Sequence, residues 1–357
     1  MAMPSRDAAR AVANWVLIGL IMLFVQVILG GITRLTGSGL SITEWNVITG
    51  IVPPISDHQW DIEFAKYQET PQFRLLNADF GLNDFKFIFF WEWLHRFWAR
   101  MVGVVFLVGF IYLLISGKLH RVMVKPLIIL FLLGALQAAV GWIMVMSGLT
   151  GDAVYVKPLK LALHFIFAIG LICYTFWFWL QLRERPGGTT AQRGLRNLAW
   201  IIIAVIFLQL MYGALMAGGK LANAAPTWPT INGDWIPDSL FASQGGGTEW
   251  IENKFTVQFI HRSLAYLLFG FTLIWTLMAR RFANMSYDLK KFRNLPLFNV
   301  SLQILLGIMT VLLSPDIVAN HWVAFDWFAL AHQITGMLFL LVMVFILYIL
   351  QPVRRTL

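Results

Sequence analysis

The sequence predicts an all-α polytopic membrane protein, with eight transmembrane helices arranged as two pseudo-symmetric four-helix bundles. Three observations lead to this fold class. The chain is 59% hydrophobic and only 13% charged, whereas about a quarter of the residues of a soluble domain are charged. It contains eight apolar runs long enough to cross a bilayer. Four histidines inside these runs form two matched pairs, which indicates a parallel internal repeat.

The eight runs justify eight helices in order along the chain. Each has roughly 18 or more predominantly apolar residues, the length that spans the hydrocarbon core. The first run is too long for a signal-peptide core and no small-residue cleavage site follows it, so we expect a permanent helix. The runs are Asn14–Thr33, Glu92–Ser116, Pro126–Met146, Leu161–Gln181, Leu198–Gly218, Phe255–Ala279, Pro296–Ser314 and Trp327–Gln351.

The charge of the connecting loops alternates along the chain. Residues 117–125, 182–197 and 280–295 are net positive, whereas residues 34–91 and 219–254 are net negative. Because Lys and Arg concentrate in the cytoplasmic loops of membrane proteins, we expect both termini in the cytoplasm. The net charge of +9 then needs no nucleic-acid partner to explain it.

The two largest outer loops are expected to be structured. Residues 34–91 include Asp57–Gln68, a polar stretch with interspersed aromatic residues, which predicts a short amphipathic helix ended by Pro71. Residues 219–254 are rich in Gly, Pro, Asn and Trp, which predicts an ordered loop. Such loops are placed to cap sites that open near the outer surface.

The four histidines of the apolar runs are the strongest functional signal. His95 and His164 are 69 residues apart, and His261 and His332 are 71 apart. A histidine inside a membrane segment is costly, so each one suggests a site. Their helices all run from outside to inside in the predicted topology. All four are therefore expected at similar depth near the outer, periplasmic face.

Two histidines from facing helices are suited to bind one haem iron from both sides. The alternative for any single histidine is a hydrogen bond to a backbone carbonyl inside the bundle, but four repeat-related positions favour ligation. Zinc and copper are disfavoured, because three of the four places have no second His, Cys or carboxylate at close spacing. The sequence predicts two haem sites, with iron ligands His95, His164, His261 and His332.

The repeat extends to polar and small residues of neighbouring helices. Parallel halves are expected, residues 1–190 and 191–357, joined by a linker at Arg183–Arg196 that contains Pro186-Gly-Gly188. The matching positions are Gln137 with Gln303, Gly141 with Gly307, Gln26 with Gln209, Gly30 with Gly213, and His95-Arg96 with His261-Arg262.

The halves differ at Glu92, which lies three residues before His95 and whose counterpart is Gln258. A carboxylate transfers protons and an amide does not, so the first site is expected to be reactive; an interfacial acid, or a residue that only orients His95, is the alternative. Arg96 and Arg262 are candidates to pair with haem propionates, with snorkelling to lipid headgroups as the alternative.

Other residues receive no functional role. His58, His120 and His321 lie in loops and are expected to be solvated. Cys173, the only cysteine, lies inside a predicted helix and is interpreted as a packing residue.

At this point the residues resemble the haem A synthase family, over nearly the whole chain and with the mitochondrial and alphaproteobacterial branch most closely. The motifs that carry the resemblance are Gly30-Gly-Ile-Thr-Arg-Leu-Thr-Gly-Ser-Gly-Leu-Ser-Ile-Thr-Glu-Trp45, Glu92-Trp-Leu-His-Arg96, Thr227-Trp-Pro-Thr-Ile-Asn-Gly233 and Val257-Gln-Phe-Ile-His-Arg262. Some family members carry a cysteine pair in outer loops, and this chain has none.

The resemblance implies oxidation of the C8 methyl of haem O to a formyl, giving haem A for cytochrome oxidase. It implies that His95 and His164 hold the substrate haem beside the catalytic carboxylate Glu92, and that His261 and His332 hold a permanent haem b. The implied setting is a bacterial inner membrane. Expected partners are haem O, haem O synthase, an external redox partner and cytochrome oxidase assembly factors, with homo-oligomerisation left open.

Two other functions stay open from the residues themselves. The first is a di-haem b electron carrier linked to quinone, which needs no asymmetry such as Glu92 against Gln258. The second is a haem transporter or chaperone, in which both sites would exchange haem.

Overall fold

The computed structural model describes residues 6–46, 49–183, 192–240, 247–282, 287–318 and 321–352. Within these residues the regular elements are helices, and eight of them are long and apolar enough to cross a membrane. This confirms the predicted all-α polytopic membrane class. The eight helices are α1 (Arg6–Leu35), α4 (Leu82–Ile115), α5 (Arg121–Met146), α6 (Pro158–Arg183), α7 (Arg193–Gly218), α9 (Lys254–Arg281), α11 (Leu295–Leu312) and α12 (Ala324–Ile349).

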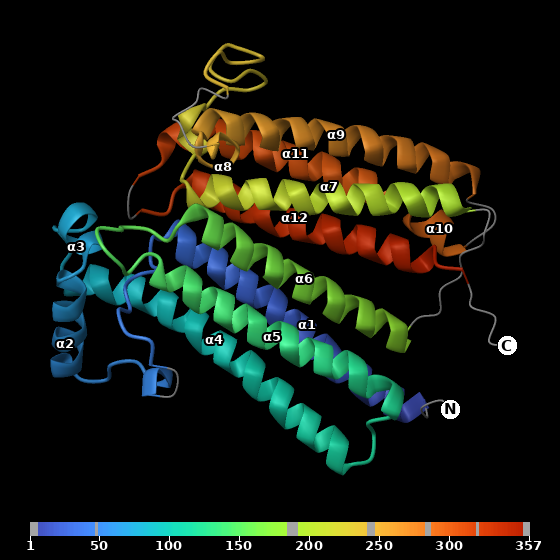
Figure 1. Ribbon diagram of the computed structural model, residues 1–357, viewed down its shortest axis with the longest axis horizontal. Helices are drawn as coiled ribbons and strands as arrows, with labels where there is room; N and C mark the ends of the chain where they lie inside the picture. The colour runs from blue at the N-terminus through green and yellow to red at the C-terminus, as the bar shows by residue number, and fades with distance from the viewer. Residues whose placement is uncertain are drawn as a thin grey trace.

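The eight helices lie in two groups of four (Figure 1). In one group α1 packs against α4 and α6, and α5 packs against α6. In the other, α7 packs against α9 and α12, and α11 packs against α12. The groups meet where α6 contacts α7 and α12, and where α1 contacts α12. The predicted division at residue 190 and most of the predicted linker fall in residues 184–191, outside the described residues, so that division stays a prediction.

One packing relationship differs between the groups. Helix α9 packs against α11, whereas the corresponding helices α4 and α5 scarcely touch. Large apolar side chains such as Leu107, Ile111 and Phe131 point outward from α4 and α5, as expected for helices that face lipid. The main buried core lies instead at the junction of the groups, where Ile169, Ile202, Trp275, Met343 and their neighbours meet.

Short helices cover one end of the bundle, which we call the capped end. They are α2 (Asp57–Gln68), α3 (Pro71–Leu76) and α8 (Glu249–Glu252), and α1 begins and α12 ends at the opposite end (Figure 1). The predicted amphipathic helix is confirmed with the same bounds. Its start is fixed by Ser56, whose hydroxyl accepts a hydrogen bond from the Gln59 N–H. Pro71 occupies the first turn of α3, where its missing N–H costs nothing.

Helix α4 begins ten residues earlier than predicted, at Leu82 instead of Glu92. The sequence prediction missed this extension because Asn83, Asp84 and Lys86 dilute its hydropathy. At 1.5 Å per residue, 34 residues span about 51 Å, well beyond the roughly 30 Å of a hydrocarbon core. The projecting turns bury Phe85 against Tyr67 of α2, which attaches the short helices to α4.

Candidate functional site

All four sequence-predicted histidines lie in the capped half of the bundle, one on each of α4, α6, α9 and α12. The imidazole rings of His261 and His332 face each other, with ring centroids 6.3 Å apart and planes inclined by 70°. His95 and His164 are close enough to interact electrostatically. The structure therefore brings together the same pairs that the repeat predicted.

Each histidine packs against a glycine of the preceding long helix. A Cβ on Gly30 would lie 3.3 Å from His95 Nε2, and one on Gly213 would lie 3.3 Å from His261 Cε1. The approach is closer in the other two cases, 2.7 Å from Gly141 to His164 Cε1 and 2.8 Å from Gly307 to His332 Cε1. The absence of a side chain at these glycines is what lets the rings occupy their positions.

A glutamine one turn before each glycine contacts the same histidine. The amide of Gln26 donates to the His95 carbonyl at 3.2 Å, and that of Gln137 donates to the His164 carbonyl at 3.1 Å. Three of the amides also reach a ring nitrogen: Gln137 lies 3.1 Å from His164 Nδ1, Gln209 lies 3.3 Å from His261 Nε2, and Gln303 lies 3.4 Å from His332 Nε2. Four helices thus carry one Gln-x-x-x-Gly motif that frames a histidine.

The histidines held by these motifs suit a haem better than a bare metal ion. Among the described residues no three His, Cys, Asp or Glu side chains gather as a metal site, which disfavours tetrahedral zinc. His261 and His332 come from different helices and lie next to each other, so they would be the residues that hold a haem iron, which would supply redox chemistry. His332 Nδ1 lies 3.0 Å from the Gln303 carbonyl, a hydrogen bond that orients the ring.

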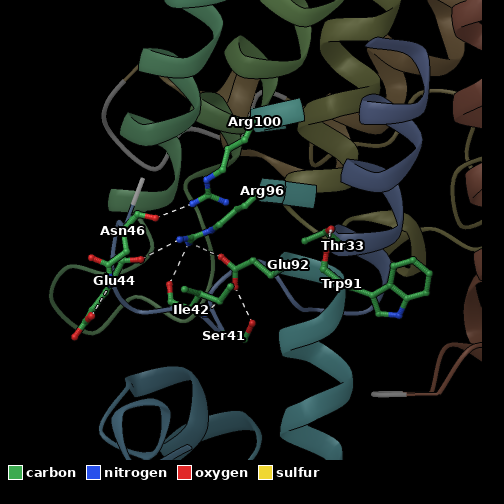
Figure 2. Close-up of polar contacts among 9 residues, drawn as sticks. All are labelled: Thr33, Ser41, Ile42, Glu44, Asn46, Trp91, Glu92, Arg96 and Arg100. Atoms are coloured by element: carbon green, nitrogen blue, oxygen red, sulfur yellow. Dashed lines mark hydrogen bonds and ion pairs between the residues drawn. The ribbon is translucent and has the colours of Figure 1, made fainter. Parts of the chain in front are cut away.

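Glu92 is 2% exposed and fully hydrogen-bonded (Figure 2). One carboxylate oxygen, Oε2, accepts from the Ser41 hydroxyl at 2.7 Å and from the Ile42 N–H at 2.8 Å. The other, Oε1, pairs with the Arg96 guanidinium at 2.5 Å. Ser41 and Ile42 belong to the loop after α1, so this buried carboxylate joins that loop to α4.

The counterpart Gln258 is also buried and occupies the same position as an amide. Its Oε1 accepts from Arg262 at 2.6 Å, and its Nε2 donates to the Leu221 carbonyl at 2.6 Å. The geometry is repeated, but the acceptor of the arginine changes from a charged carboxylate to a neutral amide. The asymmetry read from the sequence therefore lies between two otherwise equivalent positions.

Comparison with known proteins identifies the family. Residues 13–344 match the model of a family described as cytochrome oxidase assembly protein. A protein named "Heme A synthase" from Methylobacterium sp. (strain 4-46) is 40% identical over 344 residues, covering 94% of this chain and 92% of the relative. Proteins of the same name from Flavobacterium psychrophilum and Cereibacter sphaeroides (strain ATCC 17029 / ATH 2.4.9) are 37% and 38% identical, over 91% and 92% of this chain and 93% and 84% of the relatives. The chain belongs to the haem A synthase family.

In this family member Arg96 and Arg262 hold the loops of the capped end. Arg96 donates to the carbonyls of Ile42 and Glu44, each at 3.1 Å (Figure 2). Arg262 donates to the carbonyls of Ala225, Thr227 and Thr230, at 2.7, 2.8 and 3.1 Å. Their role as propionate partners stays a prediction, and the structure assigns both guanidinium groups a loop-holding role that the sequence analysis missed.

The repeated glutamines and glycines are visible in the sequence, but their histidine partners are not. Their spacing of four residues, directly on the helix before each histidine, was the available signal. It became interpretable only once the structure showed which helix face meets which histidine. The predicted solvation of the remaining histidines holds for His58 and His321, which are exposed, although His58 lies on α2 and not in a loop. His120, at the start of α5, differs from the prediction: it is only partly exposed, and its Nδ1 is buried without a hydrogen-bond partner among the described residues.

Proposed function

We propose that this chain is a haem A synthase, an oxidoreductase that converts the C8 methyl of haem O to the formyl of haem A through hydroxylated intermediates. The observation that carries the proposal is the family match over residues 13–344, together with two histidine pairs in equivalent glutamine and glycine frames. The product serves cytochrome oxidase assembly, in keeping with the description of the family.

The two halves take different roles in this proposal. Residues 1–190 hold haem O as the substrate between His95 and His164, and residues 191–357 hold a permanent haem b between His261 and His332. Haem b supplies one-electron redox chemistry when bound. The assignment is supported by a chemical difference between equivalent buried positions, the carboxylate of Glu92 against the amide of Gln258.

Glu92 is proposed to accept a proton during the oxidation. Three donors, from Ser41, Ile42 and Arg96, hold both carboxylate oxygens in place, and a carboxylate is a group that can take up a proton. Arg96 lies one helical turn from Glu92 and limits its motion, while the loop residues exclude water from one side. His95, on the same face of α4, then places the substrate within one turn of this carboxylate.

Eight apolar helices make the chain a multi-pass membrane protein. We propose the bacterial inner membrane as its location, with cytoplasmic termini and with the capped end at the periplasmic face, because basic residues concentrate in the loops of the opposite end. Proposed partners are haem O synthase, an external electron donor or acceptor and cytochrome oxidase assembly factors.

Haem analysis tests the function directly. The chain is expressed with a source of haem O, and the extracted haems are separated by chromatography and identified by mass spectrometry. We expect haem A or hydroxylated haem O. Haem b as the sole extracted haem would refute the synthase and favour the di-haem electron carrier, while unmodified haem O in both sites would favour the transporter.

A further inference from the structure

Arg34 lies in the last turn of α1, at the capped end. Its Nε is buried and has no hydrogen-bond partner, and among the described residues it forms no ion pair within 4.0 Å. A guanidinium that has a buried, unpaired nitrogen and no counterion is costly, so the position is suited to an anion.

One carboxylate, that of Asp326, acts on Arg34 through space without an ion pair within 4.0 Å. Asp326, at the start of α12, interacts with it electrostatically, but Asp326 Oδ2 accepts the Val323 N–H at 2.8 Å as the cap of that helix. The described part of the chain therefore offers Arg34 no carboxylate within 4.0 Å.

The position of Arg34 on α1 places it between the two histidine sites. Gly30 faces His95, and Gly31 faces Gln333, the neighbour of His332. At 100° per residue, Arg34 lies about 40° from Gly30 and about 60° from Gly31 around the helix. Helical side chains lean toward the N-terminus, so the side chain of Arg34 covers the turn that carries both glycines.

We propose that Arg34 binds a propionate carboxylate of the substrate haem held by His95 and His164. The proposal rests on the proposed function. A planar guanidinium is suited to a carboxylate because it donates two parallel hydrogen bonds, and Arg96 already donates to loop carbonyls. With Gly30 matched to Gly213, Arg34 corresponds to Ala217, so the second half has no equivalent cation.

Titration with free and esterified haem tests the carboxylate contact. The full-length protein is purified from cells that make no haem O, and binding of haem O and of its dimethyl ester is followed by absorbance. We expect Arg34→Leu to weaken haem O binding at least tenfold, with Arg34→Lys intermediate, and to leave binding of the ester unchanged. The control Arg74→Leu removes an exposed arginine of α3 and should alter neither affinity.

A second readout separates binding from folding. Because Arg34→Leu removes a buried unpaired charge, its thermal unfolding midpoint without haem O should equal or exceed that of the wild type. Equal haem O affinity in Arg34→Leu and wild type, or an equal loss for haem O and the ester, would overturn the proposal. If Arg34→Leu does not fold, Arg34→Lys takes its place. The proposal is then overturned if the ratio of the affinity for haem O to the affinity for its dimethyl ester is the same in Arg34→Lys as in the wild type. A wild-type protein that binds no haem O would instead refute the proposed function.

Discussion

Gly141 lies so close to His164 that a Cβ on the glycine would come within 2.7 Å of the imidazole Cε1. Gly307 has the same relation to His332, at 2.8 Å. Real Cβ atoms do not approach other heavy atoms this closely, so a methyl group at either glycine must displace the ring. The position of each imidazole is therefore set by the glycine behind it as well as by its own helix.

Gly141→Ala is expected to weaken binding of the substrate haem, because the displaced ring of His164 no longer meets the iron. The cost of the added methyl should be on the order of 1–3 kcal/mol. Haem O titration of the purified protein measures the change. Gly134→Ala is the matched control on the same helix, since nothing lies within 4 Å of a Cβ there. Equal haem O affinity in the two variants would contradict the steric argument.

Glu92→Gln is expected to keep haem bound but to reduce haem A formation by about 10²–10⁴-fold, the usual contribution of a proton-transferring group. The fold should tolerate the change, because Gln258 already makes the equivalent hydrogen bond to Arg262 at 2.6 Å. Product is measured by chromatography of extracted haem. Gln258→Glu, at the equivalent buried position, is the control and should retain most of the activity. A normal haem A yield in Glu92→Gln would remove Glu92 from the mechanism.

His261→Ala is expected to lose haem b from the second half, because one of the two facing imidazoles is removed. Reduced-minus-oxidised absorbance spectra of the purified protein should lose most of the b-type signal. His58→Ala, which changes an exposed histidine at the capped end, should leave the spectrum unchanged. A b-type signal of wild-type size in His261→Ala would place haem b elsewhere.

Because the hydroxyl of Tyr67 is buried, we expect the fold to lose stability at alkaline pH. Burial of its hydroxyl, which donates to Gln72 at 3.1 Å and accepts from Asn77 at 2.8 Å, raises the pKa of Tyr67 from 10.0 to about 12. A group with a raised pKa stabilises the fold fully below its unfolded pKa and loses that contribution as the pH rises through the folded pKa. Stability should therefore fall between pH 10 and 12, by on the order of 2–3 kcal/mol.

Thermal unfolding in detergent at pH 8 and pH 11 measures this effect. Tyr67→Phe should be less stable than the wild type at pH 8, because Asn77 and Gln72 lose their partner, but it should lose less stability at pH 11. An identical decrease in both proteins between the two pH values would show that other groups cause the alkaline loss.

Hydropathy predicted the spans well because it is a local property. Runs such as Leu198–Gly218 end within a few residues of the observed α7, whose apolar residues decide its position in a bilayer. The start of α4 was not predicted, because its first ten residues are stabilised by contacts with α2, a tertiary effect that no local pattern reveals. The amphipathic helix α2 was predicted because its capping residues and its aromatic spacing are close together in the sequence.

The histidine pairs were predictable because the repeat preserves both their depth and their partners. The contacts of Arg96 were not, because they depend on how the loop after α1 folds back over α4. Spacing predicted that Glu92 and His95 share a face of α4, but two of the donors that hold Glu92, Ser41 and Ile42, lie 51 and 50 positions away in the sequence. Sequence spacing shows which residues share a face of a helix, but only the fold shows which residues contact that face.

The Gln-x-x-x-Gly motif occurs four times, on α1, α5, α7 and α11, each time followed by a histidine helix packed against it. The smallest recurring unit is therefore a helical hairpin, and each bundle is a pair of hairpins. The two hairpins of a bundle are related by an approximate local twofold axis. This arrangement places the same kind of side chain on each face of a flat molecule bound between them. The second bundle follows this symmetry more closely, because both symmetry-related contacts are present: α7 packs against α12, and α9 packs against α11. In the first bundle α1 packs against α6, but the related pair α4 and α5 is almost without contacts. The bundle proposed to process its ligand is thus the one that departs from symmetry.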